Sequence, residues 1–107
     1  MSLKEETVQY QGKEIRLSVL ELENAVLVFF CESSLKLGTI AASLVTGDVV
    51  TSSVLLGGKY LLCSRAIAER VAAMYKKIGL VSVHTQIPEA EVVRLAHTLL
   101  NRIKGKN

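Results

Sequence analysis

Few residues in this chain could do nucleophilic chemistry. The sequence holds two cysteines, Cys31 and Cys63, and two histidines, His84 and His97. A catalytic thiol needs a histidine or a helix N-terminus to stabilise its thiolate. Cys63 directly precedes a predicted helix, so Cys63 with His84 is the candidate for a small thiol enzyme. The leucines next to Cys63 favour a packed, unreactive thiol instead.

Paired carboxylates and metal ligands are equally sparse. The only aspartate, Asp48, follows Thr46 and Gly47 in a typical turn sequence. Metal sites repeat cysteines or histidines at close spacing, whereas those of this chain stand alone. Both histidines are expected at a surface or an interface. The sequence therefore predicts no metal ion, no cofactor and no catalytic residue.

The tract Gly57-Gly58-Lys59 precedes a predicted helix, where backbone amides can bind an anion. It does not match a phosphate-binding loop, because no glycine stands five residues before Gly58 and Tyr60 follows Lys59. A tight turn between a strand and a helix is the favoured interpretation.

The length of 107 residues predicts a single domain over residues 1–107. Half of the residues are hydrophobic, so we expect some apolar surface to meet another protein and the chain to dimerise. No apolar run is long enough to span a bilayer, and the first residues do not resemble a signal peptide. We therefore expect a cytoplasmic protein with reduced cysteines and no membrane partner.

The formal net charge of +3 is spread along the chain without a dense basic block or interleaved aromatic residues. Nucleic-acid binding usually leaves such a basic patch. The sequence predicts no nucleic-acid partner.

The first half of the chain has the patterns of β-strands. Alternation over 7–10 and 14–19 predicts a hairpin, and the shift of the apolar phase after it predicts a bulge or break at 19–21. The unbroken apolar run Ala25–Cys31 predicts a central strand covered on both faces. Two more strands follow at 39–44 and Val49–Leu56, and the short connections favour antiparallel pairing of neighbours.

The second half has helical spacing. A helix is predicted over 64–78, with Ser64 as its N-cap and Gly79 as its left-handed end, and 60–63 either begins it or leads up to it. A sixth strand follows at 80–85, and Pro88 begins a helix over 89–104. The result is an α+β fold in the order βββββαβα: a mostly antiparallel sheet of about six strands covered by two helices.

Several segments, in this order, resemble the small proteasome assembly chaperones of the chaperone-three and chaperone-four type. The chaperone-three type is similar at 25–30, at Lys36-Leu37-Gly38-Thr39-Ile40 and at Val54-Leu55-Leu56-Gly57, and the chaperone-four type at 68–72, 81–83 and 100–104. Each match is a short apolar segment, and their common order from about residue 8 to residue 104 carries the resemblance.

The resemblance implies a non-enzymatic chaperone that binds proteasome α-type subunits while the α-ring assembles. It also implies a homodimer or a heterodimer with a related chaperone, in the cytoplasm and, in a eukaryote, the nucleus. We take Gly57, Gly58, Lys59 and Lys36 as candidate partner-binding residues. The link into the helix, Gly57-Gly58-Lys59-Tyr60, is shorter and less acidic than in that family. A dimeric scaffold of the roadblock or longin type, serving signalling or trafficking complexes, is the alternative.

Overall fold

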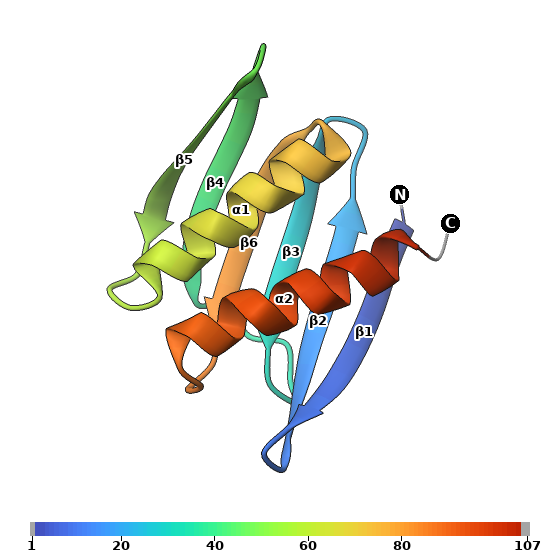
Figure 1. The fold of residues 1–107 in the computed structure, drawn as a ribbon, viewed down its shortest axis with the longest axis vertical. Coiled ribbons are helices and arrows are strands. Elements are labelled where there is room, and N and C mark those ends of the chain that lie inside the picture. The colour runs from blue at the N-terminus through green and yellow to red at the C-terminus, as the bar shows by residue number, and fades with distance from the viewer. Residues whose placement is uncertain (1, 106–107) are drawn as a thin grey trace.

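A computed structural model describes residues 2–105 as six strands and two helices (Figure 1). The elements are β1 (Ser2–Tyr10), β2 (Lys13–Glu21), β3 (Ala25–Cys31), β4 (Thr39–Thr46), β5 (Val49–Leu56), α1 (Leu61–Tyr75), β6 (Ile78–His84) and α2 (Glu89–Lys104). The predicted α+β class and the order βββββαβα are confirmed.

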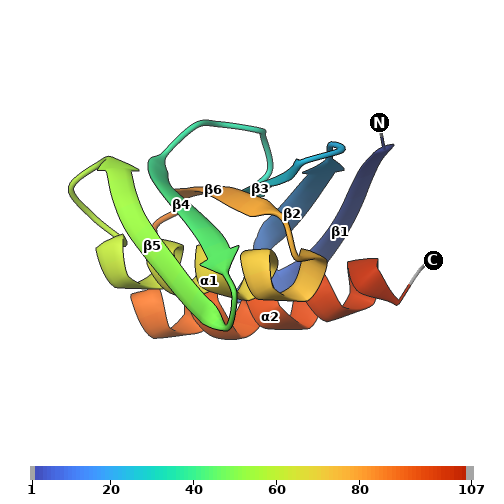
Figure 2. The ribbon, with the colours of Figure 1, turned by 90° about the horizontal axis from the view of Figure 1, so that it is seen from above.

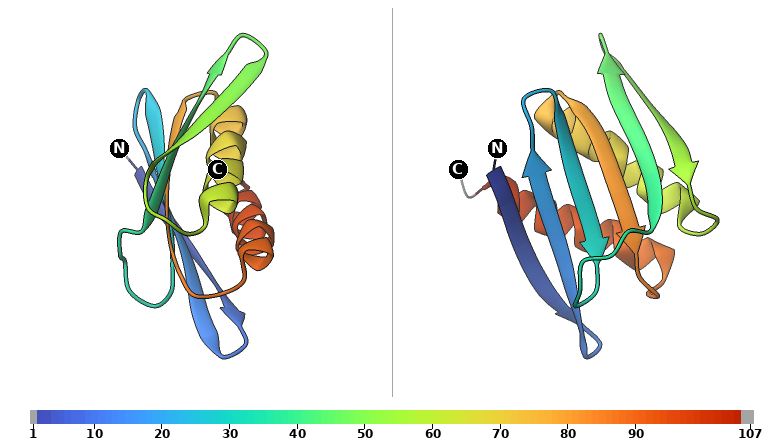
Figure 3. Two further views of the ribbon diagram at one scale, coloured as in Figure 1. Left: turned by 90° about the vertical axis from the view of Figure 1, so that its left-hand side faces the viewer. Right: turned by 180° about the vertical axis from the view of Figure 1, so that it is seen from behind.

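All six strands form one sheet in the order β1-β2-β3-β6-β4-β5. β6 lies between β3 and β4 and runs parallel to β3, while the other strand pairs are antiparallel. The prediction that β3 and β4 pair as neighbours is therefore wrong. The loop at 32–38 passes the end of β6 instead of making a tight hairpin, so β6 can occupy the place between β3 and β4 (Figure 3, right).

Both helices pack on the same face of the sheet (Figure 2). α1 covers β4, β5 and β6, and α2 covers β1 and β2. The core between the helices and the sheet is built of apolar side chains; among them are Ile15, Leu17, Val28, Phe30, Ile67, Val71, Val81, Leu99 and Ile103. Within residues 2–105, no helix lies on the opposite face of the sheet, and we call that face the open face.

β3 lies at the centre of the sheet, as predicted, but only its core face is buried along its whole length within a single chain; on the other face Cys31 alone is buried. Val26, Val28 and Phe30 point into the core, whereas Leu27 and Phe29 on the open face stay half-exposed. The expectation of cover on both faces is thus wrong for this chain alone. An unbroken apolar run indicates that both faces of a strand are buried in the functional protein. It does not indicate whether the second face is buried by the same chain or by another protein.

The predicted bulge at 19–21 is also wrong. β2 pairs with β1 and β3 through Glu21 without a register shift. The apolar phase changes because Val19 faces the core while Leu20 faces the open face, where it lies opposite Leu27. The one register shift in the described ladders falls between Ile40 and Ala41, where β4 meets β5.

The ends of α1 differ from the prediction. The helix begins at Leu61, so the segment 60–63 belongs to it, and Ser64 is buried inside its first turn rather than capping it. The helix ends at Tyr75, and Lys76 takes the left-handed conformation expected of Gly79. Gly79 instead lies in β6, where an added Cβ would come within 2.8 Å of the Ala68 carbonyl oxygen. A glycine there lets α1 pack closely on the sheet.

α2 follows Pro88 as predicted, with Glu89 and Glu91 in its first turn and Arg102 and Lys104 in its last turn. Acids near the N-terminus and bases near the C-terminus both offset the helix dipole. No helix within residues 2–105 is long and apolar enough to cross a membrane.

Candidate partner-binding surfaces

The environment of Cys63 disfavours a thiolate. One Glu89 carboxylate oxygen accepts hydrogen bonds from the backbone amides of Leu62 and Cys63, at 3.0 and 2.9 Å. An acid from the start of α2 thus occupies the N-terminus of α1, which would otherwise favour an anion. Burial of the thiol and the nearby Glu89 charge raise the pKa of Cys63 to about 12. The thiol is therefore protonated at neutral pH.

The histidines do not complete a catalytic group around Cys63. His84 ends β6, lies opposite Cys31 in the β3–β6 ladder and is exposed, as expected. His97 is half-buried in α2, where burial and the nearby Arg70 lower its pKa. Across residues 2–105, no three histidine, cysteine or acidic side chains are grouped so that they could hold a metal ion.

We expect Cys63 to resist alkylation in the folded protein. Its side chain is 1% exposed and its thiol stays protonated, whereas alkylation requires an accessible thiolate. Iodoacetamide labelling followed by mass spectrometry should find Cys63 unmodified at pH 8 until the chain unfolds. Leu62→Cys is the matched control, because Leu62 is 73% exposed and should label rapidly. Equal labelling rates for the two thiols would contradict the expectation.

The four candidate partner-binding residues lie at one end of the molecule. This end, which we call the loop end, consists of the loops at 32–38, 57–60 and 85–88, which adjoin the lower ends of β3, β5 and β6 in Figure 1. Lys36 belongs to the first loop, and Gly57, Gly58 and Lys59 to the second. The structure thus brings together residues that are separated by about 20 positions in the chain, and their role in binding stays a prediction.

Thr39 joins two of these loops. Its hydroxyl donates a hydrogen bond to the Lys59 carbonyl oxygen at 2.5 Å. Gly57, with φ of 112°, lies so close that an added Cβ would come within 2.5 Å of the Thr39 hydroxyl oxygen. Gly38 lies just as close to β6, where its Cβ would be 2.0 Å from the Val83 carbonyl oxygen. The absence of a side chain at Gly38 and Gly57 therefore allows the first loop to lie against β6 and the second loop to lie against Thr39.

The amides that follow Gly57-Gly58-Lys59 are already engaged. A phosphate at this turn would need the first amides of α1, but Glu89 accepts the Leu62 and Cys63 hydrogen bonds. The tyrosine that precedes the helix also binds this region, since the Tyr60 hydroxyl donates to the Ile87 carbonyl oxygen at 2.7 Å. The geometry agrees with a tight turn and opposes an anion site.

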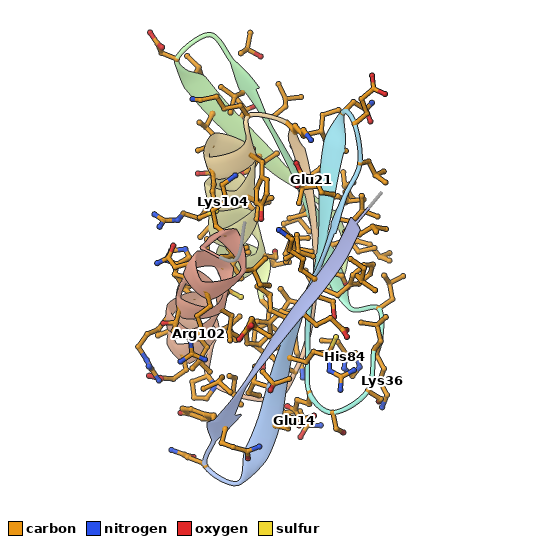
Figure 4. All side chains as sticks on the ribbon, turned by 90° about the vertical axis from the view of Figure 1, so that its right-hand side faces the viewer. Glu14, Glu21, Lys36, His84, Arg102 and Lys104 are labelled. Carbon is orange, nitrogen blue, oxygen red and sulfur yellow. The ribbon has the colours of Figure 1, made fainter. Side chains whose placement is uncertain are left out.

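Two shallow depressions mark the loop end. One of about 650 Å³ is lined by Lys59, Tyr60, Leu62, Gln86, Ile87 and Glu89 among others. The other, of about 190 Å³, is lined by Glu32, Ser33, Ser34, Lys36, His84, Thr85 and Gln86. Gln86 lines both. Lys36 and His84 project from the open-face side of the molecule (Figure 4), so the loop end meets the open face there.

A row of four leucines crosses the open face. Leu3, Leu20, Leu27 and Leu80 lie opposite one another on β1, β2, β3 and β6, and we call them the leucine row. Leu3 is 62% exposed, and the other three are half-buried. Apolar side chains at such aligned positions form a continuous surface, which water solvates poorly.

More apolar side chains extend the open face on both sides of the leucine row. They are Phe29, Leu37, Ile40, Leu44, Leu55 and Ile78. A mostly apolar pocket of about 140 Å³ lies between Leu37 in the loop at 32–38 and the strand residues beneath it, among them Leu27, Phe29 and Leu80. An apolar surface of this extent is typical of a protein–protein interface.

Sequence reasoning missed two features of these surfaces. The open face was hidden because β3 is apolar on both faces, and the strand order that aligns the leucine row depends on the insertion of β6. The capping of α1 by Glu89 was hidden because the two partners are 26 and 27 positions apart. An apolar residue at every position of a strand is the one signal that could have pointed to an uncovered face.

Comparisons with known proteins find similarity to solved structures. No family model and no curated protein sequence matches this chain. One solved structure similar to it is a chain of a chaperone complex for yeast 20S proteasome assembly, with a TM-score of 0.71 and 11% sequence identity. The match covers 96% of this chain and 98% of that chain. The predicted resemblance to proteasome assembly chaperones is therefore confirmed at the level of the fold.

Proposed function

We propose that this protein is a non-enzymatic assembly chaperone that binds proteasome α-type subunits during formation of the α-ring. The observation that carries the proposal is the fold shared, over nearly the whole of both chains, with a chaperone complex for yeast 20S proteasome assembly. The ordered resemblance in sequence points to the same class. The raised pKa of the Cys63 thiol removes the support for a thiol enzyme.

The open face and the loop end would bind different partners. The open face, with the leucine row, suits a second chaperone subunit, either a copy of this chain or a related chain. Burying an apolar face between two subunits is the usual basis of an obligate dimer. The loop end carries Lys36 and Lys59 on exposed loops and suits a more polar, temporary contact with the α-type subunit. Both encounters would take place in the cytoplasm, where the buried cysteines stay reduced.

Affinity capture of the tagged full-length chain from the source cell is the direct test. We expect α-type proteasome subunits among the captured proteins, identified by mass spectrometry, and reconstitution of the complex from purified components. Lys36→Glu with Lys59→Glu should weaken capture, since both positions are exposed and the reversed charges would face the partner. Arg102→Glu is the control, because Arg102 is exposed in the last turn of α2, at the opposite end of that helix from the loop at 85–88.

The competing functions predict other partners. Recovery of a small GTPase or its regulator would favour the roadblock or longin type of scaffold. Failure of purified α-type subunits to bind the chain would overturn the proposal. If α-type subunits bind equally well to the Lys36→Glu, Lys59→Glu variant, the assignment of the loop end is wrong and the chaperone function stands.

A further inference from the structure

The two edges of the sheet differ in charge. β1 forms one edge and carries Lys4, Glu5 and Glu6, whereas β5 forms the other edge and carries no charged residue at all. Charged side chains on an edge strand discourage pairing with another chain, and a long uncharged edge invites it. β5 is eight residues long. β1 is therefore protected against strand pairing, and β5 is open to it.

We propose that β5 pairs antiparallel with β5 of a second copy, so that one sheet continues through both chains. The pairing is centred on Ser52 and goes beyond the proposed chaperone function, because it needs no proteasome subunit. Around this centre Val50 lies opposite Val54, and Thr51 opposite Ser53. Each residue of β5 thus lies opposite an uncharged residue whose side chain points to the same face of the sheet. No like charges oppose each other across the pair.

The charges beside β5 support a second copy as the occupant. The Arg65 guanidinium donates to the Ser52 hydroxyl at 3.0 Å, and that hydroxyl donates to the Glu69 carboxylate. Arg65 and Glu69 are one helical turn apart, so the level of Ser52 falls between them. α1 runs opposite in direction to β5 (Figure 1), which places Arg65 toward one end of the strand and Glu69 toward the other.

A twofold axis through Ser52 would place opposite charges of the two copies next to each other. The axis is perpendicular to the sheet, so both α1 helices stay on the same face. Rotation places Arg65 of one copy opposite Glu69 of the other, and the reverse contact forms symmetrically. α1 packs on the helix-side face of β5 as well as on β4 and β6, but β5 is the last strand of the sheet, and no described strand pairs with its outer edge. The second copy would therefore meet the unpaired edge of β5 and side chains of opposite charge.

Charge placement at the edge tests the pairing. Thr51 and Ser53 are exposed, so substitutions there are compatible with the fold. In the double variant Thr51→Lys, Ser53→Lys, lysines face lysines across the axis, and we expect the particle mass in sedimentation equilibrium to fall by half. In Thr51→Lys, Ser53→Glu, each introduced lysine faces an introduced glutamate, and we expect the wild-type mass. A monomeric wild-type chain, or equal masses for all three proteins, would overturn the proposal.

Disulfide trapping tests the register of the β5–β5 pair independently. It remains a test of the pairing even if the double-lysine variant does not fold. Ser52 lies opposite its own copy, so Ser52→Cys should form a covalent dimer under mild oxidation. Val50→Cys is the control, because Val50 shares the same face and its copy lies several residues away. Ser52 points to the helix side, so dimers formed through the open face cannot produce this crosslink. Equal crosslinking of both variants, or of neither, would overturn the proposed pairing.

Discussion

Leu27→Asp is expected to abolish association through the open face and leave the fold intact. Leu27 sits in the middle of the leucine row, opposite Leu20 on one side and Leu80 on the other. It is only half-buried in the single chain, so the isolated fold tolerates a polar group there. In a dimer the carboxylate would be buried without a partner, at a cost of several kcal/mol. About 3 kcal/mol corresponds to a dissociation constant on the order of 100-fold larger.

Sedimentation equilibrium and capture of α-type subunits measure the two consequences. We expect a complex of lower mass and, if the chaperone acts only as a dimer, loss of the α-type subunit. Leu62→Asp is the matched control for the mass, because Leu62 is the more exposed leucine, at 73%, and lies at the start of α1, away from the open face. Unchanged mass in Leu27→Asp, or the same loss of mass in Leu62→Asp, would refute the role of the open face.

Gly38→Ala is expected to lower the free energy of unfolding by about 2 kcal/mol, because overpacking against rigid structure typically costs 1 to 3 kcal/mol. The new Cβ would come within 2.0 Å of the Val83 carbonyl oxygen, and that oxygen belongs to β6 in the middle of the sheet. The loop must therefore move and lose the Gly38 amide hydrogen bond to the Ser82 hydroxyl, at 2.8 Å. A loss of this size lowers the Tm of a domain of about 100 residues by roughly 10 °C.

Gly57→Ala and Gly58→Ala provide an internal comparison. Gly57 has φ of 112° and lies against Thr39, so alanine there is both strained and crowded. An added Cβ at Gly58 meets nothing within 4 Å, and its φ is not in the left-handed region. Thermal unfolding should rank Gly58→Ala near wild type and the other two variants well below it. A Gly58→Ala loss as large as that of Gly57→Ala would show that the turn, not the contact with Thr39, sets the cost.

Element types were predictable because their periods are local. The spacing of Ile67, Val71 and the following apolar residues predicted α1, and alternation in Glu14–Val19 predicted β2, without knowledge of distant contacts. Helix ends were less predictable. Glu89 supplies the cap that Ser64 was expected to supply, and no local pattern records a carboxylate that arrives from another helix.

One of the candidate surfaces was predictable from the sequence and the other was not. The sequence singled out Lys36 and Gly57-Gly58-Lys59, and the structure brings them to one end, where Thr39 connects the loops. The open face went unpredicted, because an apolar strand such as β3 has the same pattern whether its second cover is a helix or another protein. The contrast between the edges also depended on the strand order, which makes β1 and β5, rather than any other pair, the outer strands.

The sequence by itself determined the α+β class, the order of elements, the absence of a local catalytic motif and the likeness to proteasome assembly chaperones. These follow from short-range periodicity and from the order of segments, both of which are written along the chain. Only the tertiary structure decided that β6 enters between β3 and β4, that both helices cover one face, and that burial, together with Glu89, raises the pKa of Cys63. Those features arise from contacts between residues far apart in sequence, where packing and burial, rather than local pattern, set the free energy.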